Sequence, residues 1–444
     1  MKGEPTIYPA IGALLRRDHP NIKGIKPGQA LLPQGATTDD IVSVISRLDQ
    51  STIFIQGPPG AGKTYTASKV IVSLLQNKKR VGVSSNSHKA IVNLLQAVEK
   101  VAKEESFSFK GVKKSDPIDP GQLVNGEFIQ DIKDRDAVIK SNAQLIGGTA
   151  WLFADPALDQ QLDYLFVDEA GQVALGMLVP MATSANNIVL LGDQMQLAQP
   201  VEGVHPGESG DSVLDYLLQG QATIPPEQGI FLENTWRMHP SVCGFISDAI
   251  YNGRLKSHPN TEKRTLVLNT SADPVLKPAG IHFEAITHEG CVQDSEEEAE
   301  RVKQIYDSLL QQHYIDDKGT KQPITANNIL VVSPYNMQVN LLKQVLGEDA
   351  RVGTVDKFQG QEAEVVIISM ATSSGDEMPR NIDFLFSKNR LNVAISRAKC
   401  LAILIASPAL FSVQCRTPDE LAMVNTLCWL EHDYRPDRYE VGSS

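Results

Sequence analysis

Long hydrophobic runs are missing from this sequence of 444 residues, and cysteines are few. The longest apolar stretches, such as Leu401–Ala406, are far shorter than the roughly 20 residues that a membrane-spanning helix needs, so we expect no membrane partner. The five cysteines are an odd number without a CxxC pair, which argues against a disulfide framework and a zinc ribbon. This pattern fits the reducing cytoplasm, and the first twenty residues contain no apolar core of a signal peptide.

An excess of positive charge is also missing. Lysine and arginine number 41 against 53 aspartate and glutamate, which gives a net charge of −12. Such a chain does not attract polyanions through its overall charge, so any nucleic acid must be bound by a local groove. With 42% hydrophobic and 21% charged residues, the chain has the composition of a globular protein, and its length predicts two to four domains.

Short apolar runs alternate with helical patterns along most of the chain. This alternation predicts an α/β fold with parallel sheets covered by helices on both faces. The runs are too many for one compact unit, so we predict two α/β domains that change near Asn234, with small insertions. The expected parts are an N-terminal extension (1–49), a first domain (50–233) with an insertion at about 102–143, and a second domain (234–444) with an irregular excursion at about 255–280. The predicted strands are Thr52–Gln56, Val81–Ser84, Gln144–Gly147, Leu165–Val167, Ile188–Leu191, Ile329–Ser333, Val352–Val355, Val365–Ser369 and Leu401–Ala406.

A glycine-rich segment between the first predicted strand and a helix has the pattern GxxxxGK[ST]. Glycines let backbone N–H groups approach phosphates, and the start of the helix adds a positive dipole. Lys63 is expected to reach the β- and γ-phosphates of ATP, and Thr64 to hold Mg²⁺. The predicted nucleotide-binding residues are Gly57, Pro58, Pro59, Gly60, Ala61, Gly62, Lys63, Thr64 and Tyr65.

Two later strands end in polar residues that suit the same chemistry. Asp168 follows a buried run and could bind Mg²⁺ at the edge of the sheet where the glycine-rich loop lies. Glu169 is then placed to orient or deprotonate the attacking water. Gln194 follows another apolar run and is a candidate sensor of the γ-phosphate, because an amide can bond both phosphate and water.

Eight motifs between about residues 50 and 410 resemble the motifs of superfamily-one helicases in their order and spacing. The similarity is greatest to the 5′→3′ subgroup that includes the nonsense-mediated-decay RNA helicase, senataxin and the helicase half of the replication nuclease-helicase, and we expect a bacterial member. The strings DEAGQ, WRMHP and FQGQE point to this subgroup. The motifs are GPPGAGKT, VSSNSHKAIVNLL, VDEAGQ, LGDQMQL, NTWRMHP, SPYNMQ, TVDKFQGQE and LNVAISRAK.

The resemblance implies two RecA-like domains with ATP in the cleft between them. Arg237 and Arg397 match the two arginine fingers of the family, which stabilise charge on the transferring phosphoryl group. Glu362 matches the acid expected near the ribose. Trp236 stands where the family commonly has a tyrosine that stacks on adenine. Two family features have no match here: the glutamine that reads adenine upstream of the phosphate loop, and a small β-barrel with a stalk. The barrel is therefore reduced, or the chain is the helicase part of a longer protein.

The resemblance also implies a track for a single strand, at strand ends on the side away from ATP. Its hydroxyl, amide and aromatic groups would contact phosphate, sugar and base without reading sequence. His88 could equally be a packed histidine, and the lysines 110, 113 and 114 could either line the track or lie on a solvated loop. For Trp151 we expect core packing. The predicted track residues are Ser85, Asn86, His88, Thr149, Pro334, Tyr335 and Thr354.

Taken together, the sequence predicts an ATP- and Mg²⁺-dependent helicase or translocase that moves 5′→3′ on single-stranded nucleic acid. We expect DNA as the strand, but contacts to phosphate and sugar alone do not distinguish DNA from RNA, so RNA stays open. The alternative is a nucleic-acid-stimulated ATPase switch or clamp that remodels complexes without unwinding. No nuclease cluster is visible outside the motor motifs. Because bacterial relatives fuse a RecB-like nuclease upstream of such a helicase, a nuclease partner in cis or in trans stays open. We expect a monomer.

Overall fold

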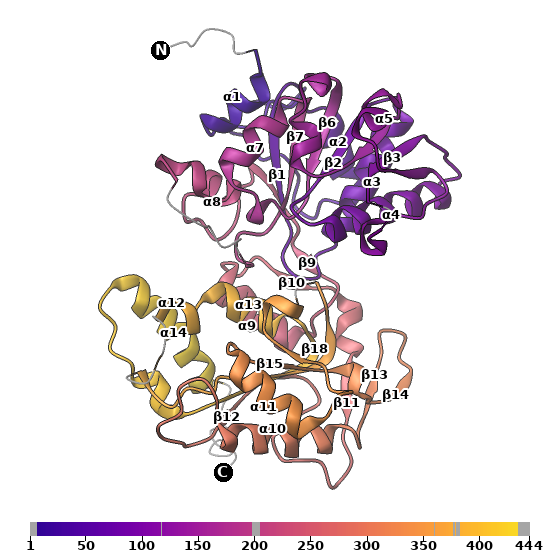
Figure 1. Ribbon diagram of the computed structural model, residues 1–444. Coiled ribbons are helices and arrows are strands. Elements are labelled where there is room, and N and C mark those ends of the chain that lie inside the picture. Colours follow the sequence, from indigo (N-terminus) through magenta and orange to yellow (C-terminus); the bar gives the residue numbers. More distant parts are fainter. Residues whose placement is uncertain are drawn as a thin grey trace. The chain divides into compact units, whose positions relative to one another are not determined.

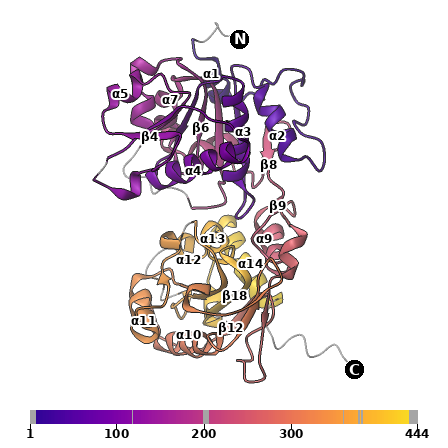
Figure 2. The same cartoon turned by 90° about the vertical axis from the view of Figure 1, so that its right-hand side faces the viewer.

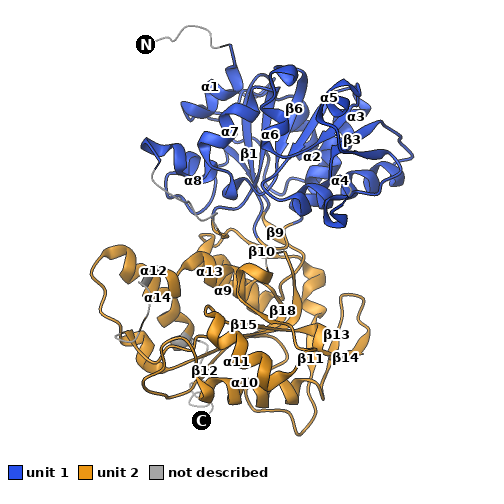
Figure 3. Ribbon diagram, viewed as in Figure 1, with its two compact units in different colours: residues 1–58, 62–194, 198–232 blue, residues 59–61, 195–197, 233–444 orange. Residues whose placement is uncertain are grey.

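The computed structural model describes residues 7–116, 118–197, 205–358, 360–375, 378 and 382–433, and it divides into two compact units. Unit 1 comprises residues 1–58, 62–194 and 198–232, and unit 2 comprises residues 59–61, 195–197 and 233–444 (Figure 3). Each unit is built on a sheet whose strands are all parallel, with helices on both faces (Figure 1). The predicted α/β class with two tandem RecA-like domains is therefore confirmed.

Unit 1 contains an eight-stranded sheet in the order β4-β3-β5-β2-β6-β7-β1-β8. The strands β1 and β2 in this sheet are buried along their whole length because helices cover both faces of the sheet. The strand predictions at β1 and β2 have the same bounds as the structure. The strands are β1 (Thr52–Gln56), β2 (Val81–Ser84), β3 (Gly111–Lys114), β4 (Ile129–Ile132), β5 (Leu145–Gly147), β6 (Leu162–Val167), β7 (Ala185–Gly192) and β8 (Gly229–Phe231).

The helices of unit 1 pack in two groups, with α2, α3 and α4 side by side and α6, α7 and α8 together. Helix α4 begins where the Ser87 side chain accepts a hydrogen bond from the backbone N–H of Ala90, which satisfies one of the free N–H groups of the first turn. The helices are α1 (Pro9–Leu15), α2 (Thr38–Ser46), α3 (Lys63–Gln76), α4 (His88–Glu104), α5 (Arg135–Lys140), α6 (Ala150–Phe153), α7 (Leu175–Ala182) and α8 (Val213–Leu218).

Two segments that the sequence set apart are integral to unit 1. Residues 102–143, expected as an insertion or mobile arm, supply β3, β4 and α5 and extend the sheet at one edge. The expected N-terminal extension packs on the sheet through α1 and α2. The hydroxyl of Thr52 donates to the carbonyl of Ala10 at 3.0 Å, and the hydroxyl of Tyr164 donates to the carbonyl of Ile45 at 3.1 Å.

Unit 2 contains a five-stranded parallel sheet in the order β12-β18-β17-β15-β16 and a small antiparallel sheet of β11, β13 and β14. Part of the irregular excursion at 255–280 is therefore ordered as β10 and β11. The strands are β9 (Asn234–Thr235), β10 (Lys256–Ser257), β11 (Thr265–Val267), β12 (Gly280–Ala285), β13 (His313–Ile315), β14 (Lys321–Pro323), β15 (Ile329–Val332), β16 (Val352–Gly353), β17 (Ala363–Ser369) and β18 (Ala398–Ala406).

The helices of unit 2 cover both faces of its sheet, with α10 and α11 on one face and α9 and α13 on the other (Figure 2). The core lies between α10, α11 and the buried sides of β15, β17 and β18. The helices are α9 (Pro240–Ile250), α10 (Glu296–Leu309), α11 (Asn336–Leu346), α12 (Ile382–Leu385), α13 (Lys388–Ile395) and α14 (Pro418–Asp433). Within the described part of the chain, none of the helices is both long enough and apolar enough to span a membrane.

Candidate active site

The glycine-rich loop connects the end of β1 to the start of α3, as the sequence predicts. Gly62 caps α3 in the left-handed region at φ 81°, which glycine adopts without strain. At Gly57 a Cβ atom would lie 2.0 Å from Cγ of Lys63, so only glycine leaves room for the lysine stem. The ammonium of Lys63 donates to the carbonyl of Gly57 at 2.5 Å. The lysine therefore lies folded over the loop that would receive a phosphate.

Asp168 and Glu169 follow β6 at the same edge of the sheet, because β6, β7 and β1 are parallel neighbours. Asp168 is buried, and burial together with the adjacent Glu169 carboxylate raises its pKa to about 7, while Lys63 acts in the opposite direction. Glu169 has the left-handed φ of 52°, which is uncommon for a residue with a side chain and is typical of functional sites. The backbone N–H of Glu169 donates to Oδ1 of Asp168 at 2.9 Å.

The residues at this edge fit a magnesium ion that is shared with a nucleotide. Burial and the neighbouring carboxylate of Glu169 disfavour the ionised form of Asp168, and a divalent cation would relieve that cost. Among the described residues, no group of three or more His, Cys, Asp or Glu side chains could hold a metal by itself. Mg²⁺ in such sites takes one or two protein ligands and completes its shell with phosphate oxygens and water. Asp168 and the exposed hydroxyl of Thr64 would be those ligands.

Gln194 lies just after β7, at the same edge of the sheet. Its side-chain N–H groups donate to the carbonyls of Gln221 and Ala222, at 3.1 and 2.7 Å. The amide is thus already hydrogen-bonded within unit 1, and its role as a γ-phosphate sensor stays a prediction.

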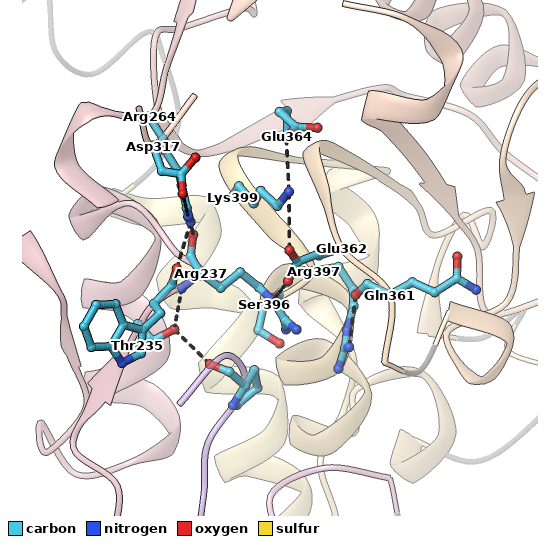
Figure 4. A network of polar contacts seen from close by, with 12 residues as sticks. Thr235, Arg237, Arg264, Asp317, Gln361, Glu362, Glu364, Ser396, Arg397 and Lys399 are labelled. Carbon is cyan, nitrogen blue, oxygen red and sulfur yellow. Dashed lines mark hydrogen bonds and ion pairs between the residues drawn. The ribbon is translucent and has the colours of Figure 1, made fainter. Parts of the chain in front are cut away.

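In unit 2, Arg237 lies in a network of charged side chains (Figure 4). Its Nε donates to Glu362 at 2.6 Å, and one terminal nitrogen donates to the carbonyl of Ser396 at 3.1 Å. Lys399 bridges Glu362 and Glu364 at 3.3 and 3.2 Å. Burial alone would raise the pKa of Glu362, but Arg237 and Lys399 outweigh it and hold that pKa below its usual value. Glu362 is therefore an ionised partner of Arg237.

The backbone beside Arg237 is held by a second arginine. Arg264 donates to the carbonyls of Trp236 and Arg237, at 2.9 and 2.6 Å, and forms an ion pair with Asp317 at 3.8 Å. A cavity of about 320 Å³ opens next to this network. Its wall includes Arg264, Tyr314, Asp317, Glu362, Glu364 and Lys399.

Arg397, the second predicted finger, has a different setting. Only 2% of the residue is exposed. Its Nε donates to the carbonyl of Val393 at 3.0 Å, and a terminal nitrogen donates to the carbonyl of Gln361 at 3.1 Å. Arg397 thus ties the end of α13 to the segment before β17, in addition to any role toward a nucleotide.

Two aromatic residues of the predicted nucleotide set are exposed. Trp236 stacks on His258 with ring centroids 3.5 Å apart and planes 19° apart, and 52% of the tryptophan stays exposed. Tyr65, in the first turn of α3, is 54% exposed.

The tip of the glycine-rich loop, residues 59–61, belongs to unit 2 and lies against β9. The hydroxyl of Thr235 donates to the carbonyl of Pro59, and the backbone N–H of Trp236 donates to the carbonyl of Gly60, both at 2.9 Å.

The predicted nucleic-acid residues of unit 1 follow β2 and β5 at the carboxyl ends of these strands. The glycine-rich loop also follows the carboxyl end of its strand, β1, which lies four strands from β5 in the same sheet, so the position of the track relative to ATP stays a prediction. Ser85 is buried, and the side-chain amide of Asn86 donates to the carbonyl of Gln172. His88 lies 3.5 Å from the ammonium of Lys113, and burial together with that ammonium lowers the histidine's pKa.

In unit 2, Pro334 and Tyr335 follow β15 and Thr354 follows β16. Tyr335 is only 4% exposed and packs against Phe384 with ring centroids 5.7 Å apart. Stacking of a base on Tyr335 would require this packing to open, whereas Pro334 and Thr354 are partly exposed.

Several functional candidates were not assigned from the sequence. Lys113, weighed as a track or loop lysine, is fully buried and donates to Ser115 Oγ and the carbonyl of Gln122, at 2.9 and 2.6 Å. Trp151, expected in the core, is 81% exposed, so that expectation is wrong. Lys399 directly follows the SRA string and could have been noticed, but nothing in the sequence marks Arg264.

Comparisons with known proteins find related chains over most of the sequence. Family profiles described as AAA domain match residues 41–201 and 210–409. The chain is 26% identical over 408 residues to the DNA polymerase alpha-associated DNA helicase A of Schizosaccharomyces pombe, an alignment that covers 78% of this chain and 59% of that protein. It is 26% identical over 422 residues to the regulator of nonsense transcripts 1 homolog of Neurospora crassa, covering 83% and 37%.

The chain thus spans less than two thirds of the length of these relatives. Among solved structures, it is similar to the DUF1998 helicase MrfA bound to DNA, with a TM-score of 0.46, 10% sequence identity, and coverage of 94% of this chain and 56% of that one.

Proposed function

Because the chain belongs to the superfamily-one helicases, we propose that it is an ATP-driven motor that moves 5′→3′ along single-stranded nucleic acid, with DNA as its substrate. The proposal covers this chain's own residues. The activities of the longer relatives are not carried over.

One observation supports ATP hydrolysis most directly. Lys63 and Asp168 come from different loops at one end of the sheet's strands, and the lysine partly offsets the rise in the pKa of Asp168 that burial and Glu169 cause. A cation, a buried acid and a loop of backbone N–H groups at a helix start are what a nucleoside triphosphate with Mg²⁺ requires.

Each residue then has a defined task. Backbone N–H groups of Gly60, Ala61 and Gly62 and the ammonium of Lys63 would bind the phosphates, and Thr64 and Asp168 would hold Mg²⁺. Bound Mg²⁺ would neutralise charge on the β- and γ-phosphates. Glu169 accepts the proton of the attacking water, and its left-handed backbone directs the carboxylate from the strand end. During the ATP cycle, Arg237 and Arg397 of unit 2 act on the transferring phosphoryl group, which couples hydrolysis to domain closure.

Recognition of the base rests on Trp236. Its indole can stack on adenine at least as well as a phenol ring, and stacking alone discriminates weakly between purines. We therefore expect ATP to be preferred, with GTP accepted at a lower rate. Comparing kcat/KM for ATP and GTP tests this expectation, and equal values would remove adenine recognition from the proposal.

The decisive experiment measures ATP hydrolysis by the purified chain with Mg²⁺, titrated in parallel with single-stranded DNA and single-stranded RNA. We expect stimulation by single strands, stronger with DNA. A partner assay follows displacement of a labelled strand from duplexes that carry either a 5′ or a 3′ overhang. Unwinding from the 5′ overhang alone supports the motor. Stimulated hydrolysis without displacement from either duplex favours the switch or clamp, and a lack of stimulation by any strand contradicts both.

Salt dependence tests the kind of track. The predicted contacts are mainly hydroxyl and amide groups on a chain of net charge −12, so we expect a shallow slope of log affinity against log salt. A slope that implies many neutralised phosphates would contradict this track. A RecB-like nuclease partner, in cis or in trans, and a monomeric state complete the proposal, and light scattering on the purified chain tests the latter.

A further inference from the structure

The three tryptophans of the chain lie in different settings. Trp236 stacks on His258, and Trp429 packs against Phe245 with ring centroids 5.4 Å apart. Trp151 is 81% exposed, the most exposed of the three. It lies in the one-turn helix α6, where the next two side chains, Leu152 and Phe153, are buried. The turn that buries these two directs the indole into solvent. A single exposed apolar residue is common on protein surfaces, so its position must decide whether it has a role.

Trp151 follows the carboxyl end of β5, two residues after Thr149. Strand β5 pairs with β2 on one side and β3 on the other, with Gly147 opposite both Val83 and Lys113. Parallel strands are about 4.8 Å apart, so the chain leaving β5 has the loop of Ser85 and Asn86 on one flank and Lys114 on the other. The hydroxyl of Thr149 makes no capping hydrogen bond to α6. The exposed ring thus belongs to the segment that follows β5, one strand away from the segment of Ser85 and Asn86 that the resemblance assigned to a single strand.

Two cations complete this part of the edge. Lys89 lies exposed in the first turn of α4, and Lys114 is partly exposed at the end of β3. Neither forms an ion pair with a carboxylate of the described residues, whereas Asp116, which follows β3, is paired with Lys133 at 3.7 Å. Lysines without a carboxylate partner and an exposed aromatic ring at the ends of neighbouring strands are a combination that suits single-stranded nucleic acid, because cations can bind the backbone and a ring can stack on a base.

The ring is also too far away to serve the nucleotide. In the sheet order, β5 is four strands from β1, which carries the glycine-rich loop. At about 4.8 Å a strand, this separation is roughly 19 Å. A base bound through phosphates at Lys63 cannot reach Trp151, so the two sites occupy separate halves of one sheet edge.

We propose that Trp151 is a base-stacking residue for the single strand, with Thr149, Lys89 and Lys114 as its backbone-binding neighbours. This inference rests on the proposed function, since it assumes a single-stranded ligand. It adds a residue that the motif resemblance does not supply and places the strand over β2, β5 and β3 of unit 1.

The test measures binding of thymidine oligonucleotides to the full chain without ATP, by intrinsic fluorescence and by anisotropy. We expect the oligonucleotide to quench the wild-type emission, and most of that quench to disappear in Trp151→Phe. Trp151→Ala should weaken binding roughly 5- to 150-fold, the range that corresponds to stacking of one base, while Trp151→Phe should keep most of the affinity. Met177→Ala, which removes another exposed apolar side chain of unit 1 from α7, is the matched control and should bind normally.

An abasic series sharpens the test. One missing base, moved along the oligonucleotide, should weaken wild-type binding at one position, and Trp151→Ala should no longer sense that position. The melting temperature of Trp151→Ala should equal that of the wild type, because the side chain is exposed.

Wild-type affinity in Trp151→Ala, with binding otherwise intact, would overturn the stacking role and favour a protein partner for the ring. A uniform loss on intact and abasic strands together with a lower melting temperature would also overturn it, in favour of a structural role. Failure of every variant and of the wild type to bind any oligonucleotide would contradict the proposed function itself.

Discussion

The two parallel sheets carry the residues that are predicted to act on the nucleotide at opposite ends of their strands. In unit 1, the glycine-rich loop, Asp168 and Gln194 all follow the carboxyl ends of strands, namely β1, β6 and β7. In unit 2, Glu362 directly precedes β17, and Arg397 directly precedes β18. The charged network of unit 2 therefore lies at the amino ends of its strands.

The carboxyl edge of unit 2 is filled instead by a buried polar network. Gln338 donates to the hydroxyl of Ser369 at 2.9 Å, Ser369 donates to Glu298 at 2.6 Å, and the other carboxylate oxygen of Glu298 lies 3.0 Å from His288. His288 in turn contacts the hydroxyl of Ser373 at 2.7 Å. Two sheets of the same kind thus divide the predicted chemistry: one would offer backbone N–H groups and a lysine to a phosphate, and the other would offer arginines that are already hydrogen-bonded, Arg237 to an acid and Arg397 to backbone carbonyls.

The largest effect should come from the phosphate side. Lys63→Ala removes the cation that neutralises the β- and γ-phosphates, and we expect ATP turnover to fall by a factor of about 10³ or more. Steady-state ATPase measurements with saturating single strand check this prediction. Lys69→Ala, on the same helix, removes an ion pair with Glu105 and should leave turnover unchanged. Near-wild-type hydrolysis in Lys63→Ala would remove the glycine-rich loop from the active site.

Measurements of both stability and turnover should distinguish the roles of Arg237 and Arg397. We expect Arg237→Ala and Arg397→Ala each to lower kcat by about 10³ or more, with ATP affinity largely retained, because a finger acts on the transition state. Arg237→Ala should cost less stability, about 1 kcal/mol, since Glu362 is half-exposed and keeps Lys399 as a partner, and only the carbonyl of Ser396 loses its donor. Arg397→Ala should cost roughly 1–3 kcal/mol, because buried carbonyls of Val393 and Gln361 lose their donor.

Thermal unfolding, kcat and nucleotide affinity on the same preparations give the comparison. If Arg397→Ala lowers the melting temperature but leaves kcat intact, Arg397 is a structural residue and Arg237 is the only finger of the pair. If ATP affinity collapses in either variant while kcat holds, that arginine binds the ground state.

Glu169→Gln should separate binding from chemistry within unit 1. The amide cannot accept the proton of water, so we expect kcat to fall by about 10² to 10⁴, while Asp168 and Thr64 still hold Mg²⁺ and ATP binds. The variant should also trap the strand affinity of the ATP-bound state, which a strand-binding assay with and without ATP measures. Loss of ATP binding together with turnover would shift the water-positioning role to Gln194.

Much of the fold is readable from the sequence because strands of a covered parallel sheet are continuous apolar runs, as in β1, β15 and β18. The edge strand β4 and its neighbour β3 were missed because their sequences, IQDI and GVKK, are half polar. Lys113 can be buried in β3 because the segment that follows β3 accepts hydrogen bonds from its ammonium group, for example at the carbonyl of Gln122. That compensation depends on the tertiary structure and leaves no local signal.

The candidate site likewise has parts that the sequence predicts and parts that it does not. The glycine-rich loop and the acid after β6 follow from spacing, because a short loop between strand and helix fixes its own geometry. The ion pair of Arg237 with Glu362 joins residues 125 apart, and a single sequence contains no information on that pairing. Trp151 was misjudged because three successive apolar residues in one helical turn point in different directions, and the sequence does not say which one faces the core.

The smallest predicted effect is a loss of folding stability at acid pH, which should arise in the sheet of unit 2 from His282 in β12. Burial, with a smaller contribution from Lys277, lowers the pKa of His282 to about 4. Because the pKa of His282 in the folded chain lies below the usual value of about 6.5, the unfolded chain binds the proton first as pH falls. The contribution of the neutral histidine to folding stability is therefore complete above pH 6.5 and is lost as pH falls toward 4. We expect the histidine to account for about 1–2 kcal/mol of destabilisation between pH 7.5 and pH 5, or a few degrees in melting temperature. Tyr164 in the sheet of unit 1, whose pKa burial raises to about 12, stays neutral throughout this range. His282→Leu should remove this part of the pH dependence, whereas His19→Leu, at an exposed position, should not. If melting curves of the His282 variant and the wild type fall in parallel from pH 7.5 to pH 5, the buried histidine does not carry the acid sensitivity of unit 2.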